Sequence, residues 1–163
     1  MMDNMDDLSF HKRFLTGKFG EIRRRLLAAC SQLDEAALNW RPTPESNSVA
    51  NLVLHIAGNI HERIGASMLE RPYDRDRAAE FDSTANLTRE RLEQVLNEAF
   101  DLLCTTLDEA TPELLQQTQN VRGNERSNLL VFHQAASHFS EHLGQVLYIA
   151  KMRLNEGYQT TSI

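Results

Sequence analysis

Histidines at helical spacing are the first residues in this sequence that could do chemistry. His138 and His142 lie four residues apart in HQAASHFSEHLGQVLYIAK, residues 133–151, a stretch with the apolar spacing of one helix. Because residues i and i+4 occupy adjacent turns of one helix face, both imidazoles can bind a single metal ion. Glu141 precedes His142 instead of following His138, so the HExxH metalloprotease motif is absent. His133 projects to another face and is expected on the surface.

A metal ion needs a further ligand from a different helix, and His55 is the best candidate. It lies between Leu52 and Ile56 in a segment that is apolar almost all round, where an imidazole needs a partner. Its helical angle, however, aligns it with Asn59, away from the main apolar stripe. Two interpretations therefore remain open at this point. The histidines form one metal site, or they are separate polar residues satisfied by hydrogen bonds at the edge of a helical core.

The elements that must position these histidines are helices. Apolar residues recur at steps of three, four and seven, glycine (7) and proline (4) are scarce, and strand-like alternation is nearly absent. QQTQNVRGNERS, residues 116–127, is expected to be an irregular loop or a small hairpin, and TPELL a short helical turn. The sequence predicts an all-α four-helix bundle in one domain spanning residues 1–163. Its long helices are expected at residues 8–33, 48–69, 88–110 and 128–155.

Composition excludes several classes of protein. The net charge of −6 over 163 residues argues against a nucleic-acid partner, because such proteins present a basic surface. No segment approaches the roughly 20 apolar residues that a membrane span requires. Cys30 and Cys104 lie on apolar helix faces without CxxC spacing, and MMDNMDDLSF has no apolar run. The chain is therefore expected to be cytoplasmic, with free thiols.

Motifs along most of the chain resemble those of a known superfamily. LNWRPTPESNSVANLVLHIAGN, residues 38–59, and the later H-x-x-x-H-x-G-Q-x-x-Y-I-A-K resemble the DinB-like, or YfiT-like, superfamily of metal-dependent hydrolases. The chain is more narrowly similar to an uncharacterised bacterial branch of that superfamily. Three further matches point to this branch: Tyr73 to Arg77 with Glu80-Phe81, residues 87–90, and Val121-Arg122-Gly123.

The resemblance implies a fold and a metal site. The fold would be a four-helix bundle of up-down-down-up topology, often a homodimer. One divalent metal ion, zinc or nickel, would be bound by His55, His138 and His142. Relatives include transferases and isomerases that use low-molecular-weight thiols, so the implied partner is a small-molecule substrate, and a small thiol is one candidate.

Three more residues are candidates for the pocket or for support of the ligands. Asn59 and Gln145 each lie one helical turn from a proposed ligand and could orient it or contact a substrate; simple helix–helix hydrogen bonds are the alternative. His11 lies on the inner face of the first helix and either lines the pocket or sits at the edge of the core. Arg75 and Asp76 either cover the site or pair with each other.

Three functional hypotheses follow. The first is a metal-dependent enzyme, either a thiol-dependent S-transferase or a hydrolase, because three neutral imidazoles leave open positions on the metal. The second is a protein that binds a small ligand without turnover. The third is a structural homodimer with a vestigial metal site. An open metal position beside a cavity favours the first, and a closed shell of side chains favours the third.

Overall fold

A computed structural model describes residues 3–162 and shows a chain that is mostly helical. Predictions that concern residues 1–2 and 163 lie outside this range. The long helices are α1 (Asp3–Cys30), α3 (Val49–Ile60), α5 (Arg89–Glu109) and α7 (Asn128–Leu154), and a π-helical segment, η1 (His61–Ala66), continues α3. The four predicted helical segments are thus confirmed, with ends that differ by a few residues. No helix in the described range is long and apolar enough to cross a membrane.

Hydroxyl side chains define where the helices begin. Ser48, Thr88 and Ser127 each accept a hydrogen bond from the backbone N–H three residues later, at the first turns of α3, α5 and α7. At α3 the arrangement is reciprocal, because the Asn51 side chain accepts from the Ser48 N–H. These caps end the preceding loops and fix the starting points of the helices that carry the histidines.

Two short helices were missed in segments expected to be loops. They are α2 (Glu35–Leu38) and α4 (Arg77–Glu80), and the side chains of Asp34 and Asp76 cap their first turns. Asp76 therefore caps α4 and does not pair with Arg75. TPELL forms α6 (Pro112–Gln116), and a 3₁₀ turn, η2 (Asn155–Gly157), follows α7. Single-turn helices carry too little apolar periodicity to be predicted from spacing.

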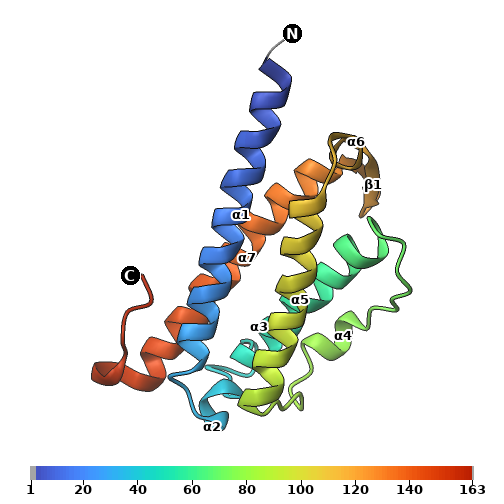
Figure 1. Cartoon of the computed structure of the whole chain (residues 1–163). Helices are drawn as coiled ribbons and strands as arrows, with labels where there is room; N and C mark the ends of the chain where they lie inside the picture. The colour runs from blue at the N-terminus through green and yellow to red at the C-terminus, as the bar shows by residue number, and fades with distance from the viewer. Residues whose placement is uncertain (1–2, 163) are drawn as a thin grey trace.

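The segment left open between a loop and a hairpin is a hairpin. Strand β1 (Thr118–Val121) pairs antiparallel with β2 (Asn124–Ser127). The two connecting residues, Arg122 and Gly123, have φ values of 53° and 83°, as a tight primed turn requires. Because β2 leads directly into α7, the hairpin lies beside the first turns of that helix (Figure 1).

The buried apolar residues form one continuous core between the long helices. α1 packs against α7 and α5, and α3 packs against α5 and α7 (Figure 1). Phe19, Phe100, Phe132 and Phe139 are fully buried at the centre. Both cysteines are free thiols, and burial raises the pKa of Cys30 to about 12, so this thiol is inert at neutral pH.

Asn51 ties the segment after α4 to the start of α3. Its Nδ2 donates to the backbone carbonyls of Glu80, at 2.9 Å, and Asp82, at 3.0 Å. The side chain is almost completely buried, so these bonds are shielded from water. This amide, together with Arg41, which donates to the Phe81 carbonyl, therefore fixes the position of residues 80–82 relative to the helix that carries His55.

Substituting Asn51→Ala is expected to lower the free energy of unfolding by about 2–4 kcal/mol, because buried carbonyl groups lose their donor. Urea denaturation followed by circular dichroism measures the change. Asn86→Ala is the matched control, since Asn86 is exposed, and its change should stay within about 0.5 kcal/mol. Equal midpoints for the two variants would contradict the role given to Asn51.

Candidate metal centre

The structure brings His55, His138 and His142 together. His55 comes from α3, and the other two come from adjacent turns of α7. His138 Nε2 lies 3.2 Å from His55 Nε2 and 2.8 Å from His142 Nε2. One nitrogen from each of the three rings lies within 4.8 Å of the others, an arrangement compatible with a metal site. It is the one such group of His, Cys, Asp or Glu within residues 7–162.

The two short nitrogen–nitrogen distances and the proton arrangement of the rings are compatible with a metal ion. Nitrogens that bind zinc at about 2.0–2.1 Å lie roughly 2.9–3.4 Å apart for bond angles of about 90–110°. The Nδ1 atoms of His55 and His142 face acceptors, Glu80 Oε2 and Gln145 Oε1, so their Nε2 atoms keep lone pairs. His138 Nε2 can donate to only one of these two lone pairs. A cation between the rings satisfies all three nitrogens at once.

A buried carboxylate orients His55. Glu80 Oε2 lies 2.9 Å from His55 Nδ1, and both side chains are less than a tenth exposed. Such a bond fixes the tautomer of the imidazole and directs Nε2 toward His138. Arg75 in turn holds the carboxylate, with Nε 2.6 Å from Glu80 Oε1, and also binds Glu62 at 2.8 Å. Arg75 therefore reaches the site through the carboxylate that it holds.

The charges around these rings keep the site in the protonation states that a metal requires. Burial opposes ionisation of Glu80, but hydrogen bonds from His55 and Arg75 outweigh it and lower the pKa of the carboxyl below its ordinary value. Burial, together with the neighbouring imidazoles, lowers the pKa of His138 to about 4. Burial also lowers the pKa of His142. The site thus combines an ionised Glu80 carboxylate with neutral His138 and His142 rings at neutral pH.

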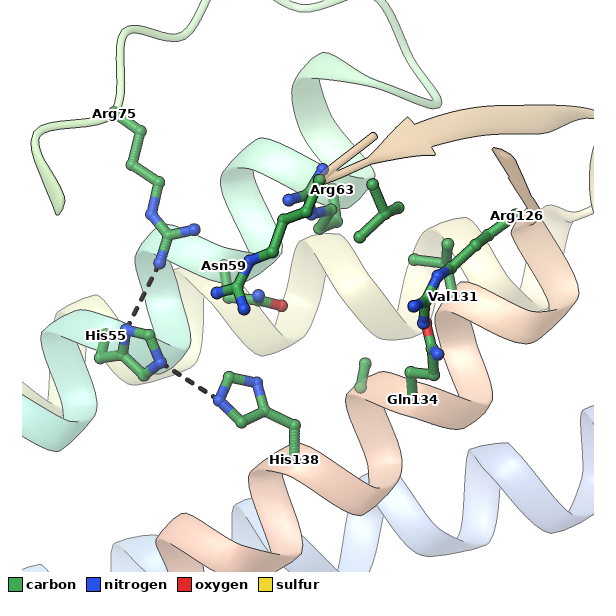
Figure 2. Close-up of a pocket in the computed structure, with 11 residues that line it drawn as sticks. His55, Asn59, Arg63, Arg75, Arg126, Val131, Gln134 and His138 are labelled. Atoms are coloured by element: carbon green, nitrogen blue, oxygen red, sulfur yellow. Dashed lines mark hydrogen bonds between the residues drawn. The ribbon is translucent and has the colours of Figure 1, made fainter. Parts of the chain in front are cut away.

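A cavity of about 240 Å³ opens beside His55 and His138. Asn59, one turn after His55, is among the residues that line it. Figure 2 shows the two imidazoles at one end of the cavity and Arg126, Val131 and Gln134 at the other. The lining residues come from α3, η1, the loop before α4, the hairpin and α7: His55, Asn59, Arg63, Arg75, Val121, Arg122, Arg126, Val131, Gln134, Ala135 and His138.

The remaining candidates occupy different places. Gln145 contacts His142, with Oε1 2.7 Å from Nδ1. His11 is not among the residues that line the cavity; its Nδ1 lies 3.0 Å from His133 Nε2 instead. The prediction that His133 is a surface residue is wrong, because α1 runs alongside α7 and leaves this ring half-buried against His11.

Sequence reasoning missed the role of Glu80 and of Gly58. Glu80-Phe81 marked the family resemblance, but its place in a charged segment gave no sign that the carboxylate is buried. Gly58 follows His55 by three residues, and a Cβ there would lie 2.0 Å from Glu80 Oε1. The absence of a side chain at Gly58 is therefore what lets Glu80 approach α3.

Two solved structures share this helical fold. A conserved protein from Enterococcus faecalis aligns with a TM-score of 0.73 and 16% identity, over 86% of this chain and 95% of that one. A DinB-like protein, YjoA, from Bacillus subtilis aligns with a TM-score of 0.66 and 16% identity, over 90% of this chain and 94% of that one. The fold is therefore that of the DinB-like superfamily, as the sequence motifs implied.

Within that superfamily, the chain belongs to the family described as protein of unknown function DUF1572, whose model matches residues 10–163. No curated protein matches the sequence. The family membership and the fold agree with the three-histidine cluster, and neither specifies an activity.

Gly58→Ala is expected to destabilise the protein by about 1–3 kcal/mol, because the new methyl group overlaps the Glu80 carboxylate. Thermal unfolding measures the effect. Gly20→Ala provides the control: a Cβ at this α1 position meets no heavy atom within 4 Å, so the substitution should stabilise by about 0.5–1 kcal/mol. If both variants became more stable, the close approach of Glu80 to α3 would be disproved.

The metal-free protein is expected to lose stability as the pH falls from 6.5 toward 4. His138 has a pKa of about 4 when folded and an ordinary value of 6.5, so the unfolded chain binds more protons between these limits. Denaturation in a chelator at pH 7.0, 6.0 and 5.0 measures the slope. His138→Gln should flatten it. An unchanged slope in this variant would show that His138 is not held neutral.

Proposed function

We propose that His55, His138 and His142 bind one divalent metal ion, zinc or nickel, and that the protein is a metal-dependent enzyme acting on a small molecule. The reaction class we propose is thiol-dependent S-transfer or hydrolysis. The observation that supports this most is the convergence of three imidazole nitrogens beside a cavity. Three protein ligands with adjacent space are typical of catalytic metal sites, whereas structural sites are closed by a fourth ligand.

The metal ion would supply Lewis acidity, which lowers the pKa of a water or a thiol at the open position. The chain's own residues prepare that position. Glu80 accepts the His55 Nδ1 proton and Gln145 faces His142 Nδ1, so both rings present Nε2. Arg75 keeps Glu80 ionised and in place. Carboxylate support of this kind raises the basicity of an imidazole ligand.

Two other classes of protein are the alternatives. One is a protein that binds a small ligand without turnover, and the other is a structural homodimer with a vestigial site. The cavity supports the enzyme over the structural reading, because side chains do not fill the space beside His138. We further propose, from the likeness to DinB-like proteins, an up-down-down-up helix order, a single domain over residues 1–163 and a cytoplasmic homodimer. The packing of α1 on α5 and of α3 on α7 supports that helix order, because a bundle with its helices in sequential order would instead pack α1 on α3 and α5 on α7.

Metal content tests the proposal directly. Protein purified without a histidine tag is expected to contain about one zinc or nickel ion per chain by elemental analysis. His55→Ala/His142→Ala should abolish binding, because one imidazole cannot hold the ion. His133→Ala is the matched control: it removes a half-buried imidazole of α7 outside the cluster and should leave metal content unchanged.

A substitution at Glu80 distinguishes residues that bind the metal ion from a residue that only orients a ligand. Glu80→Gln keeps a hydrogen-bond acceptor for His55 but removes the charge, so metal affinity measured against a chelator should fall about 10–100-fold without loss of stoichiometry. Absence of metal from the wild type after incubation with zinc and with nickel would refute the metal centre. Metal retained by the double variant would refute the ligand assignment.

A further inference from the structure

Four arginines line the cavity beside the three histidines. Arg63 comes from η1, Arg75 from the loop before α4, Arg122 from the hairpin turn and Arg126 from β2. None of the lining residues in the described chain is acidic. The protein as a whole is acidic, with a net charge of −6, so this concentration of positive charge runs against its composition.

The four arginines differ in their partners. Arg75 is neutralised by Glu80 and Glu62, and Arg63 lies 3.4 Å from Glu62 and donates to the Asn120 carbonyl. Within residues 7–162, the side chains of Arg122 and Arg126 make no hydrogen bond or ion pair. The two hairpin arginines thus leave about two positive charges without a counter-charge in the cavity lining, and Arg126 lies at the end of the cavity away from His55 (Figure 2).

Polar amides also line the cavity. Figure 2 shows Gln134 of α7 at the end that Arg126 occupies, whereas Asn59 of α3 follows His55 by one helical turn. Neither amide side chain has a hydrogen-bond partner among the described residues. Val121, Val131 and Ala135 supply an apolar wall alongside them. The cavity therefore combines unpaired hydrogen-bond donors with the imidazoles of His55 and His138 within about 240 Å³.

We propose that the substrate or co-substrate carries an oxyanion, a carboxylate or phosphate group, which Arg122 and Arg126 bind while its reactive end lies at the histidine cluster. This inference rests on the proposed metal-dependent function and specifies the substrate class for it. The planar guanidinium group binds such oxyanions through two parallel hydrogen bonds, which fixes orientation as well as position. Asn59, near the histidines, and Gln134, at the end that Arg126 occupies, are placed to bind further polar groups of the same molecule.

Three small thiols that share a two-carbon chain and carry an anionic, a neutral or a cationic end group provide the test. Binding of 3-mercaptopropionate, 2-mercaptoethanol and cysteamine to the zinc-loaded, full-length protein is measured by calorimetry. The zinc content of each sample is determined in parallel. The anionic thiol is expected to bind about tenfold or more tightly than the neutral one, and the cationic thiol most weakly.

The double variant Arg122→Gln/Arg126→Gln distinguishes the contribution of the arginines to anion affinity from that of the metal ion. This distinction is needed because the metal ion itself attracts any anion. The affinity of this double variant for 3-mercaptopropionate should fall about tenfold or more, while its affinity for 2-mercaptoethanol should be unchanged. Arg13→Gln, which removes one exposed arginine of α1 outside the cavity, should leave both affinities unchanged. Competition by phosphate or by acetate then identifies the preferred oxyanion, and the more potent competitor should lose its effect in the double variant.

The outcomes distinguish this inference from the proposal it rests on. A protein that contains no zinc under saturating conditions refutes the metal centre. A zinc-loaded protein that binds none of the three thiols, or binds all three equally, refutes the oxyanion site while the metal centre stands. The oxyanion site is equally refuted if the preference for the anionic thiol survives in the arginine double variant, because the metal charge alone then explains it.

Discussion

The hydrogen bond between His55 and the buried Glu80 carboxylate is the interaction on which the site depends. A carboxylate at 7% exposure is stable only with charged or hydrogen-bonding partners, and Arg75 and His55 supply them. Its approach to α3 requires the missing side chain of Gly58, and Asn51 holds its backbone from the same helix. Four residues distributed over 30 positions thus serve to place one imidazole.

The other two histidines need no such support, because helical geometry places them. His138 and His142 occupy adjacent turns of α7, and the packing of α7 on α3 brings His55 opposite them. This is the part of the site that could be predicted from spacing alone. The apolar periodicity that gives the long helices is local information, and so are the caps at Ser48, Thr88 and Ser127. Assigning His55 as the partner required the family resemblance, since its angle also fitted an exposed position.

What the sequence could not predict depends on contacts between distant segments. Glu80 and Arg75 lie in a run of charges that resembles a solvated loop, and only the fold shows that this run covers α3. His133 was expected on the surface because its own helix presents it away from the core. The long α1 covers that face, so the ring lies against His11. In each case the local pattern was read correctly, and a second element changed the environment.

The distribution of charge links the support of the metal centre to the choice of substrate. Glu80 and Glu62 neutralise Arg75 at the histidine end, so the rings there face no unpaired cation from that arginine. The hairpin adds Arg122 and Arg126 to the lining of the same cavity without acidic partners. Arg122 is exposed and Arg126 is partly buried, and both line the cavity in a chain whose net charge is −6. Two uncompensated cations that line the same cavity as His55 and His138 fit the proposed anionic molecule, because they would hold one end of it while its other end reaches the metal site.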